Sequence, residues 1–273
     1  MRYGYQNTDG KVSIDSVAVF CDALQNRNPL EIDSFIDFFN ACEALVLSEF
    51  KATQGAINNV RGNWYEWLIS IGSLHYAEKT PNSIGLFVQL PNVRSLDYMS
   101  LYETDIYKYI EDLKQKTSAR GVSLISSNPD YAIIRRTQNN EFPDLSNIDA
   151  AAIARVDNYH KQFLGNLDFE GIIGFASIKT SLRPDRRLQL SHEGALVKAF
   201  YEHLKGRLWK VDARGLKYYG VATEVKESDV EGLRTVATHS ILSVNTKPEA
   251  AVDEVFQITS GGNLSSFLDK VLF

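Results

Sequence analysis

Apolar residues recur at helical spacing along the first part of the chain. Between residues 12 and 50 they include Ile32, Phe35, Ile36 and Phe39. Such spacing gathers apolar side chains on one helix face, so we expect residues 1–55 to form a helical N-terminal portion. A further helix is predicted over residues 58–71, where the acid Glu66 stands among mostly apolar or neutral neighbours. An acid in such surroundings needs a partner or a function.

Beyond residue 80, short apolar runs typical of β-strands alternate with helical patterns. Strands are predicted over residues 84–90, 122–126, 131–135, 171–178, 218–225 and 236–244. Helices are predicted over residues 105–116, 150–165 and 191–205, and from about residue 264. Asn128-Pro129-Asp130 separates two of the strands and places Asp130 on a bend. Ser260-Gly261-Gly262-Asn263 lacks the spacing of a phosphate-binding loop and is interpreted as a turn.

This order of elements indicates the fold class. Helices come first, and the strands that follow are interleaved with further helices. We therefore expect an α/β (α+β) fold with a central mixed β-sheet flanked by helices. The whole chain, residues 1–273, is predicted to be one domain, and residues 58–225 are predicted to form the core that carries its catalytic and recognition residues.

Composition and charge exclude several classes of protein. The chain has 273 residues, of which 44% are hydrophobic, and a net charge of −5. The acidic balance disfavours a protein that coats nucleic acid by bulk charge, so a nucleic-acid partner would need a local basic patch. Cys21 and Cys42 belong to no metal-binding or disulfide pattern, which suits a reducing cytoplasm. No apolar run is long enough for a membrane helix, so we expect a cytoplasmic protein with no membrane partner.

Charged residues directly after the apolar run 171–178 carry the candidate chemistry. Lys179 ends this strand, and the bend before residue 131 presents Asp130 at the same edge of the sheet. Hydrolysis of a phosphodiester uses oxygen ligands for Mg²⁺ and a basic group beside the attacking water. Asp130 and Glu193 can supply the ligands and Lys179 the basic group. These residue types therefore predict a nuclease that depends on Mg²⁺.

The spacing of these residues resembles that of the CCGG-recognising type II restriction endonucleases of the NgoMIV and SgrAI kind, within the PD-(D/E)xK nuclease superfamily. That family has Pro-Asp, then Ser-x-Lys nearly fifty residues on, and a Glu fourteen residues beyond the Lys. This chain has Pro129-Asp130, Ser177-Ile178-Lys179 and Glu193. Its Arg183-Pro184-Asp185-Arg186 matches the family's Arg-Ser-Asp-Arg except at Pro184, which removes a backbone donor.

The resemblance implies a role for each matched residue. Asp130 and Glu193 would bind Mg²⁺, with the Ile178 carbonyl as a further ligand, and Glu66 would assist as the upstream helix acid. Arginine recognises guanine and aspartate accepts from cytosine, so the DNA-reading residues would be Arg183, Asp185 and Arg186. The implied substrate is double-stranded DNA cut before the first C of CCGG to leave 5′ overhangs. The implied assembly is a homodimer or dimer of dimers, with a cognate DNA methyltransferase in the same system but no stable complex with it.

Other interpretations remain open at the level of the sequence. A structure-selective repair nuclease of the same superfamily would share Asp130 and Lys179 without needing the recognition residues. A non-catalytic DNA-binding protein would keep the fold and lose cleavage. Residues 183–187 can also form a solvated charged loop, and Glu66 can belong to a structural ion pair.

Overall fold

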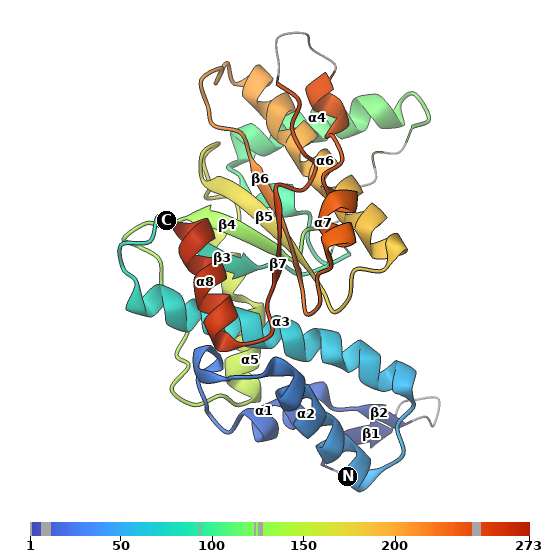
Figure 1. Ribbon diagram of the computed structural model, residues 1–273. Coiled ribbons are helices and arrows are strands. Elements are labelled where there is room, and N and C mark those ends of the chain that lie inside the picture. Colours follow the sequence, from blue (N-terminus) through green and yellow to red (C-terminus); the bar gives the residue numbers. More distant parts are fainter. Residues whose placement is uncertain (1, 7–11, 93, 123, 125–127, 242–246) are drawn as a thin grey trace. The chain divides into compact units, whose positions relative to one another are not determined.

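The computed structural model describes residues 2–6, 12–92, 94–122, 124, 128–241 and 247–273. The chain divides into two compact units (Figure 1). The first contains residues 1–83, 141–159 and 258–273, and the second contains residues 84–140 and 160–257. Within the described chain, no helix is both long and apolar enough to cross a membrane.

The first unit is mainly helical. Its elements are β1 (Gly4–Gln6), β2 (Val12–Ile14), α1 (Ser16–Leu24), η1 (Pro29–Glu31), α2 (Phe35–Glu49), α3 (Gln54–Lys79), α5 (Ala150–Asp157) and α8 (Gly261–Leu272). The helical N-terminal portion is therefore confirmed, but β1 and β2 form an antiparallel hairpin that the sequence analysis did not predict. Helices α1, α2, α3, α5 and α8 each begin after a polar side chain that accepts from a backbone amide: Asp15, Ser34, Thr53, Asp149 and Ser260.

The turn predicted at Ser260–Asn263 is instead the first turn of α8. The Ser260 hydroxyl accepts from the Asn263 amide at 3.1 Å and caps the helix. Position 261 needs a glycine because the backbone of Leu30 is close: a Cβ added there would lie 2.2 Å from the Leu30 carbonyl carbon. Close packing, rather than turn geometry, accounts for this glycine.

The second unit contains the mixed sheet that the sequence predicted. Its strands are β3 (Gly85–Gln89), β4 (Tyr131–Arg135), β5 (Ile172–Lys179), β6 (Lys217–Ala222) and β7 (Glu254–Gln257), hydrogen-bonded in that order. The β3–β4 and β4–β5 pairs are antiparallel, and the β5–β6 and β6–β7 pairs are parallel. The helices of this unit are η2 (Tyr98–Leu101), α4 (Thr104–Ser118), α6 (Pro184–Arg207), α7 (Glu227–Leu233) and η4 (Thr238–Ile241). Helix η3 (Tyr159–Phe163) begins at the boundary of the two units.

One strand predicted in the second unit is wrong, another lies mostly outside the described chain, and one strand was missed. The strand predicted over residues 236–244 is helix η4 up to residue 241, and only Val236 forms an isolated bridge, to Ala250. Residues 242–246 lie outside the described chain, as does most of the strand predicted over residues 122–126. Strand β7 was missed because it has only four residues and two of them, Glu254 and Gln257, are polar.

Helix α6 begins seven residues earlier than the predicted start at residue 191. Pro184 occupies its first turn, where a missing N–H costs nothing and the fixed φ suits the helix. Arg183 before it is extended, at φ −61° and ψ 159°, as the residue before proline prefers. The helix predicted over residues 191–205 would place Glu193 in its first turn, and this is wrong, since Glu193 lies in the interior of α6.

Candidate active site

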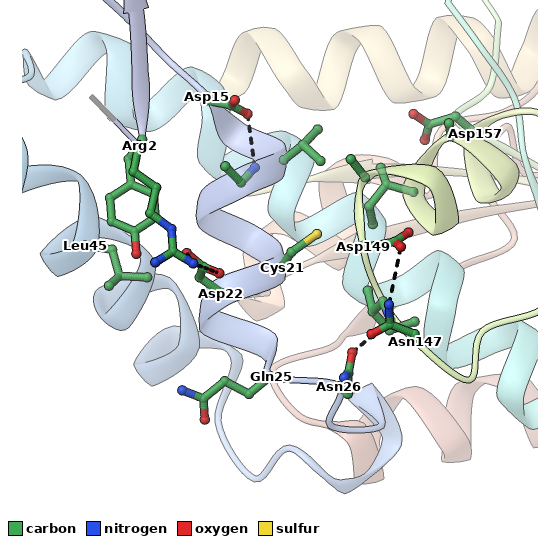
Figure 2. A pocket seen from close by; sticks show the side chains of 17 residues that line it. Arg2, Asp15, Cys21, Asp22, Gln25, Asn26, Leu45, Asn147, Asp149 and Asp157 are labelled. Atoms are coloured by element: carbon green, nitrogen blue, oxygen red, sulfur yellow. Dashed lines mark hydrogen bonds and ion pairs between the residues drawn. The ribbon is translucent and has the colours of Figure 1, made fainter.

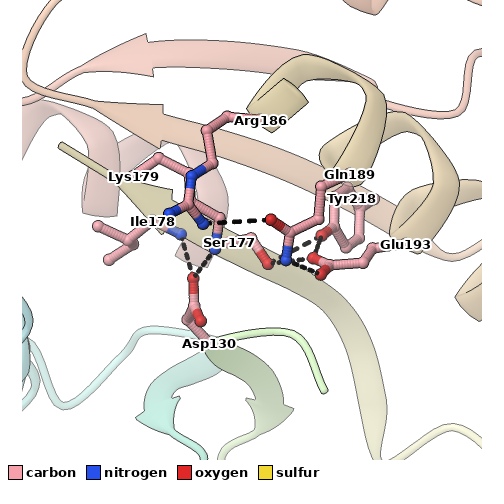
Figure 3. Close-up of polar contacts among 8 residues, drawn as sticks. All are labelled: Asp130, Ser177, Ile178, Lys179, Arg186, Gln189, Glu193 and Tyr218. Atoms are coloured by element: carbon pink, nitrogen blue, oxygen red, sulfur yellow. Dashed lines mark hydrogen bonds and ion pairs between the residues drawn. The ribbon is translucent and has the colours of Figure 1, made fainter. Parts of the chain in front are cut away.

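Asp130 lies where β4 begins and β5 approaches its end. The two strands are antiparallel with Tyr131 opposite Ala176, which brings the residue before β4 close to the last residues of β5. Oδ2 of Asp130 accepts a hydrogen bond from the Ile178 amide at 2.6 Å and one from Lys179 Nζ at 3.0 Å (Figure 3). The predicted bend thus brings a carboxylate and an ammonium group together at one edge of the sheet.

The electrostatic environment of Asp130 disfavours an isolated negative charge. Burial raises the pKa of Asp130 above its ordinary value of 3.8. The Lys179 charge and the Ile178 N–H oppose that shift, and the nearby Glu193 charge adds to it. The net direction is upward, so a cation between the two carboxylates would relieve an unfavourable concentration of charge.

Glu193 is held by three side-chain donors. It is 2% exposed, and its Oε2 accepts from Ser177 Oγ at 2.9 Å and from the Tyr218 hydroxyl at 2.8 Å. Its Oε1 accepts from Gln189 Nε2 at 2.8 Å (Figure 3). The Tyr218 hydroxyl also lies 2.8 Å from Ser177 Oγ. A carboxylate this buried needs such partners, and β5, β6 and α6 each supply one.

Sequence reasoning missed two members of this cluster, Tyr218 and Gln189. Nothing in the sequence marks Tyr218, because its approach to Ser177 and Glu193 depends on the parallel pairing of β5 with β6. Gln189 stands four residues before Glu193, a spacing at which side chains face each other in a helix, but the helix predicted from residue 191 left it outside.

The predicted DNA-reading residues lie together at the N-terminus of α6. The side chains of Arg183 and Asp185 are each 65% exposed, and that of Arg186 is 43% exposed. Asp185 lies 3.5 Å from Arg183 Nη2 and 3.9 Å from Arg186 Nε. At these distances the two exposed ion pairs are weak. Arg187 differs, because its Nη1 donates at 2.9 Å to the nearly buried Asp229. Arg187 therefore contributes less to an open basic patch than its sequence position suggests.

Two further predicted residues have less support from the geometry. Ile178 enters the cluster through its amide N–H, and its carbonyl as a metal ligand stays a prediction. Glu66 lies on α3 in the first unit, partly exposed, whereas Asp130, Lys179 and Glu193 belong to the second unit. Its role also stays a prediction.

The carboxylates fit Mg²⁺ better than a metal held by protein ligands alone. Among the described residues, no three His, Cys, Asp or Glu side chains group closely enough to hold an ion. Mg²⁺ keeps several waters and needs only one or two carboxylates. Both hydrogen bonds of Asp130 described above fall on Oδ2, and Oε1 of Glu193 has a single donor, Gln189. Each carboxylate thus retains acceptor capacity for a cation and its waters.

The first unit contains a hollow of about 950 Å³ with a different character (Figure 2). Four aspartates line it, and each supports the fold: Asp15 and Asp149 cap helices, Asp22 pairs with Arg2, and Asp157 accepts from Trp67. Burial and the neighbouring carboxylates raise the pKa of the Cys21 thiol at its wall to about 11. A wall with this excess of negative charge disfavours DNA phosphates.

Comparison with known proteins identifies the family of the chain. The profile of the Cfr10I/Bse634I restriction endonuclease family matches residues 5–273. The chain is 42% identical over 243 residues to the type II restriction enzyme Cfr10I of Citrobacter freundii, covering 86% of this chain and 84% of that protein.

Two solved structures share the fold. One is the Bse634I restriction endonuclease, with a TM-score of 0.89 and 30% identity over 98% of this chain and 96% of that chain. The other is Bse634I with cognate DNA, with a TM-score of 0.88 and 30% identity over 99% of this chain and 97% of that chain. The fold expected from the sequence is therefore confirmed. The chain is a type II site-specific deoxyribonuclease and belongs to the Cfr10I/Bse634I family of restriction endonucleases.

Proposed function

We propose that this restriction endonuclease hydrolyses double-stranded DNA with Mg²⁺ at a palindrome containing CCGG. It cuts before the first C and leaves 5′ overhangs. The observation that carries the proposal is the convergence of Asp130, Lys179 and Glu193 from three segments of the chain at one edge of the sheet.

Each of these residues has a distinct task. Asp130 and Glu193 hold Mg²⁺, with the Ile178 carbonyl as an additional ligand. When bound, the cation stabilises charge on the reacting phosphate and the leaving oxygen. Lys179, 3.0 Å from Asp130, orients the attacking water, and in its neutral amine form it receives the proton of that water. Glu66, the upstream helix acid of the resemblance, has an assisting role that rests on that resemblance alone.

The N-terminus of α6 reads the sequence. Arg183 and Arg186 donate to guanine in the major groove, and Asp185 accepts from cytosine. Their exposure and their long contacts with one another leave these groups available to base edges. Two arginines and one aspartate per subunit suit the two guanines and neighbouring cytosines of CCGG.

A palindrome calls for a twofold assembly. A homodimer presents the same residues to both strands, and a dimer of dimers binds two sites. We place the enzyme beside the NgoMIV and SgrAI kind on the basis of its Ser-x-Lys and distant Glu. Its partners are DNA and its own copies in the cytoplasm, with a cognate methyltransferase that forms no stable complex with it.

Digestion of a plasmid of known sequence with Mg²⁺ tests the proposal. We expect discrete fragments whose mapped ends fall before the first C of CCGG. Nonspecific nicking would favour a structure-selective or repair nuclease. Specific binding without cutting would favour a non-catalytic DNA-binding protein. Discrete fragments with ends elsewhere would retain the nuclease and overturn the CCGG assignment.

A further inference from the structure

Gln189 joins a proposed base contact to a proposed metal ligand. Its Nε2 donates to Glu193 Oε1 at 2.8 Å, and its Oε1 accepts from Arg186 Nη1 at 3.3 Å (Figure 3). The three side chains follow one another at spacings of three and four residues, so they share one face of α6. A single amide group therefore contacts both residues.

Gln189 acts on the oxygen of Glu193 that is less firmly held. Oε2 accepts from both Ser177 and Tyr218, which lie on two neighbouring strands. Oε1 accepts from Gln189, on the same helix as Glu193 itself. With Oε2 held by the sheet, the rotation that aims Oε1 depends on Gln189.

The backbone of α6 beside Glu193 is fixed. A Cβ added at Gly194 would lie 2.1 Å from the Ala251 carbonyl oxygen, so the helix lies directly against that segment. One turn later, the buried Lys198 donates to the Ala250 carbonyl at 2.7 Å and pairs with Asp253 at 2.6 Å. Since the helix has little room to shift, a change at Arg186 reaches Glu193 through side chains.

Arg186 is able to change partners. Its side chain is 43% exposed, its contact with Asp185 is 3.9 Å, and its bond to Gln189 is long at 3.3 Å. A guanine offers two acceptors to an arginine, so a bound base competes with the Gln189 carbonyl for the guanidinium. Once that donor leaves, the Gln189 amide is free to turn, and its bond to Glu193 changes with it.

We propose that Gln189 is a positioning residue that couples the base bound at Arg186 to the orientation of the Glu193 carboxylate. This inference rests on the function proposed above. A correct base pair releases Gln189 from Arg186, whereas a wrong pair leaves the two joined. Sequence is then discriminated in the cleavage step as well as in binding. Couplings of this kind change an equilibrium by about 5- to 150-fold.

Gln189→Met tests the coupling, because methionine keeps the length and helix propensity but can neither donate nor accept as the amide does. The matched control is Gln115→Met at an exposed position of α4. Two duplexes are compared, one with the site mapped by digestion and one with the base pair at Arg186 altered. Single-turnover rates at saturating enzyme are measured with Mg²⁺, and binding is measured with and without Ca²⁺.

For the wild type and the control, the rate at which the bound complex cleaves DNA should differ between the two duplexes by about 5- to 150-fold. In Gln189→Met this ratio should fall to within about twofold. Binding gives a second measure that needs no cleavage. Ca²⁺ should tighten wild-type binding to the mapped site more than to the altered duplex, and should tighten both equally in Gln189→Met.

The outcomes separate this inference from the proposed function. If the wild type cuts specifically and the rate ratio persists in Gln189→Met, the coupling alone is overturned. The same holds if the wild type cuts specifically but shows no rate ratio between the two duplexes. A wild type that cuts no DNA overturns the proposed function, and a Ca²⁺ effect independent of the base pair then overturns the coupling as well. Should Gln189→Met unfold, as judged by thermal denaturation, Gln189→Ala replaces it in the same measurements.

Discussion

The Lys179 ammonium and the Ile178 amide both donate to Oδ2 of Asp130, at 3.0 and 2.6 Å. Among the described residues the carboxylate is therefore fixed through Oδ2, and Oδ1 keeps acceptor capacity for a cation or a water.

Asp130→Asn should lower cleavage by several orders of magnitude while folding and specific DNA binding persist. The change removes the charge that a cation needs and adds almost no volume. Binding without metal should tighten, because a carboxylate facing a phosphate repels it. Cleavage assays and gel-shift titrations check both effects, with Asp212→Asn as an exposed control. Cleavage at the wild-type rate would remove Asp130 from the site.

Lys179→Ala and Glu193→Gln should each abolish cleavage, but only Glu193→Gln should recover partly at high Mg²⁺ or Mn²⁺. A weakened ligand set can be refilled by mass action, whereas a missing base cannot. Cleavage rates across a metal titration distinguish the two. If Lys179→Ala recovers and Glu193→Gln does not, the two roles are exchanged.

Arg186→Ala should cost about 1–3 kcal/mol of discrimination for each base pair contacted, because a base contact is lost. Nonspecific binding should weaken less, and its salt dependence should change by at most about one phosphate contact. Affinities for a CCGG duplex and a scrambled duplex at two salt concentrations measure this. Equal weakening on both duplexes with a reduced salt slope would make Arg186 a phosphate contact.

Arg187→Ala provides the matched contrast on the same helix turn. It leaves the Asp229 carboxylate without its 2.9 Å partner, so we expect about 1–3 kcal/mol of lost stability. Urea denaturation of both variants measures the difference. A stability loss as large in Arg186→Ala would mean that Arg186 also serves the fold.

The raised pKa of Asp130 predicts how stability depends on pH. Below about pH 3.9 the side chain is protonated in both the folded and the unfolded chain. As pH rises toward the folded-state pKa, the unfolded chain loses its proton first, and the wild type loses stability relative to Asp130→Asn. Urea denaturation of both proteins with chelator, from pH 3 to 7, should show this difference growing and then levelling off above the folded pKa. A change in the opposite direction would mean that Lys179 and the Ile178 amide outweigh burial.

Two neighbouring glycines in α8 should respond oppositely to alanine. Gly261→Ala places a Cβ 2.2 Å from the Leu30 backbone, so we expect a loss of at least about 1–3 kcal/mol. Gly262→Ala meets nothing closer than Ser260 Oγ at 3.8 Å and should be neutral or stabilise by up to about 1 kcal/mol. Thermal unfolding of the pair is the measurement. Equal stability of the two variants would contradict the close approach of Leu30.

The sequence predicts the strands at this sheet edge because the pattern of each strand is local. A nearly continuous apolar run marks β5, and the bend before β4 delivers Asp130 beside Lys179 as expected. The start of α6 was missed because Pro184 and its charged neighbours have the composition of a loop. Their helical state depends on proline suiting a first turn.

The hydrogen bonds around Glu193 are beyond prediction from one sequence. Tyr218 reaches the carboxylate through the pairing of β6 with β5, a long-range contact that leaves no periodic signal. Likewise, the strand predicted over residues 236–244 does not form in its described part, residues 236–241, where helix η4 lies. Local patterns identify elements, whereas their neighbours depend on the whole fold.

The division of the chain bears on how the enzyme can be handled. Strands β4 and β5 pair directly, yet the connection between them includes residues 141–159, which belong to the other unit. The peptide backbone passes between the units four times, after residues 83, 140, 159 and 257. Neither a single proteolytic cut nor a truncation from one end of the chain can therefore isolate the unit that contains Asp130 and Lys179. Each unit is built from separate segments of the chain, so removing one unit leaves the other as disconnected peptides.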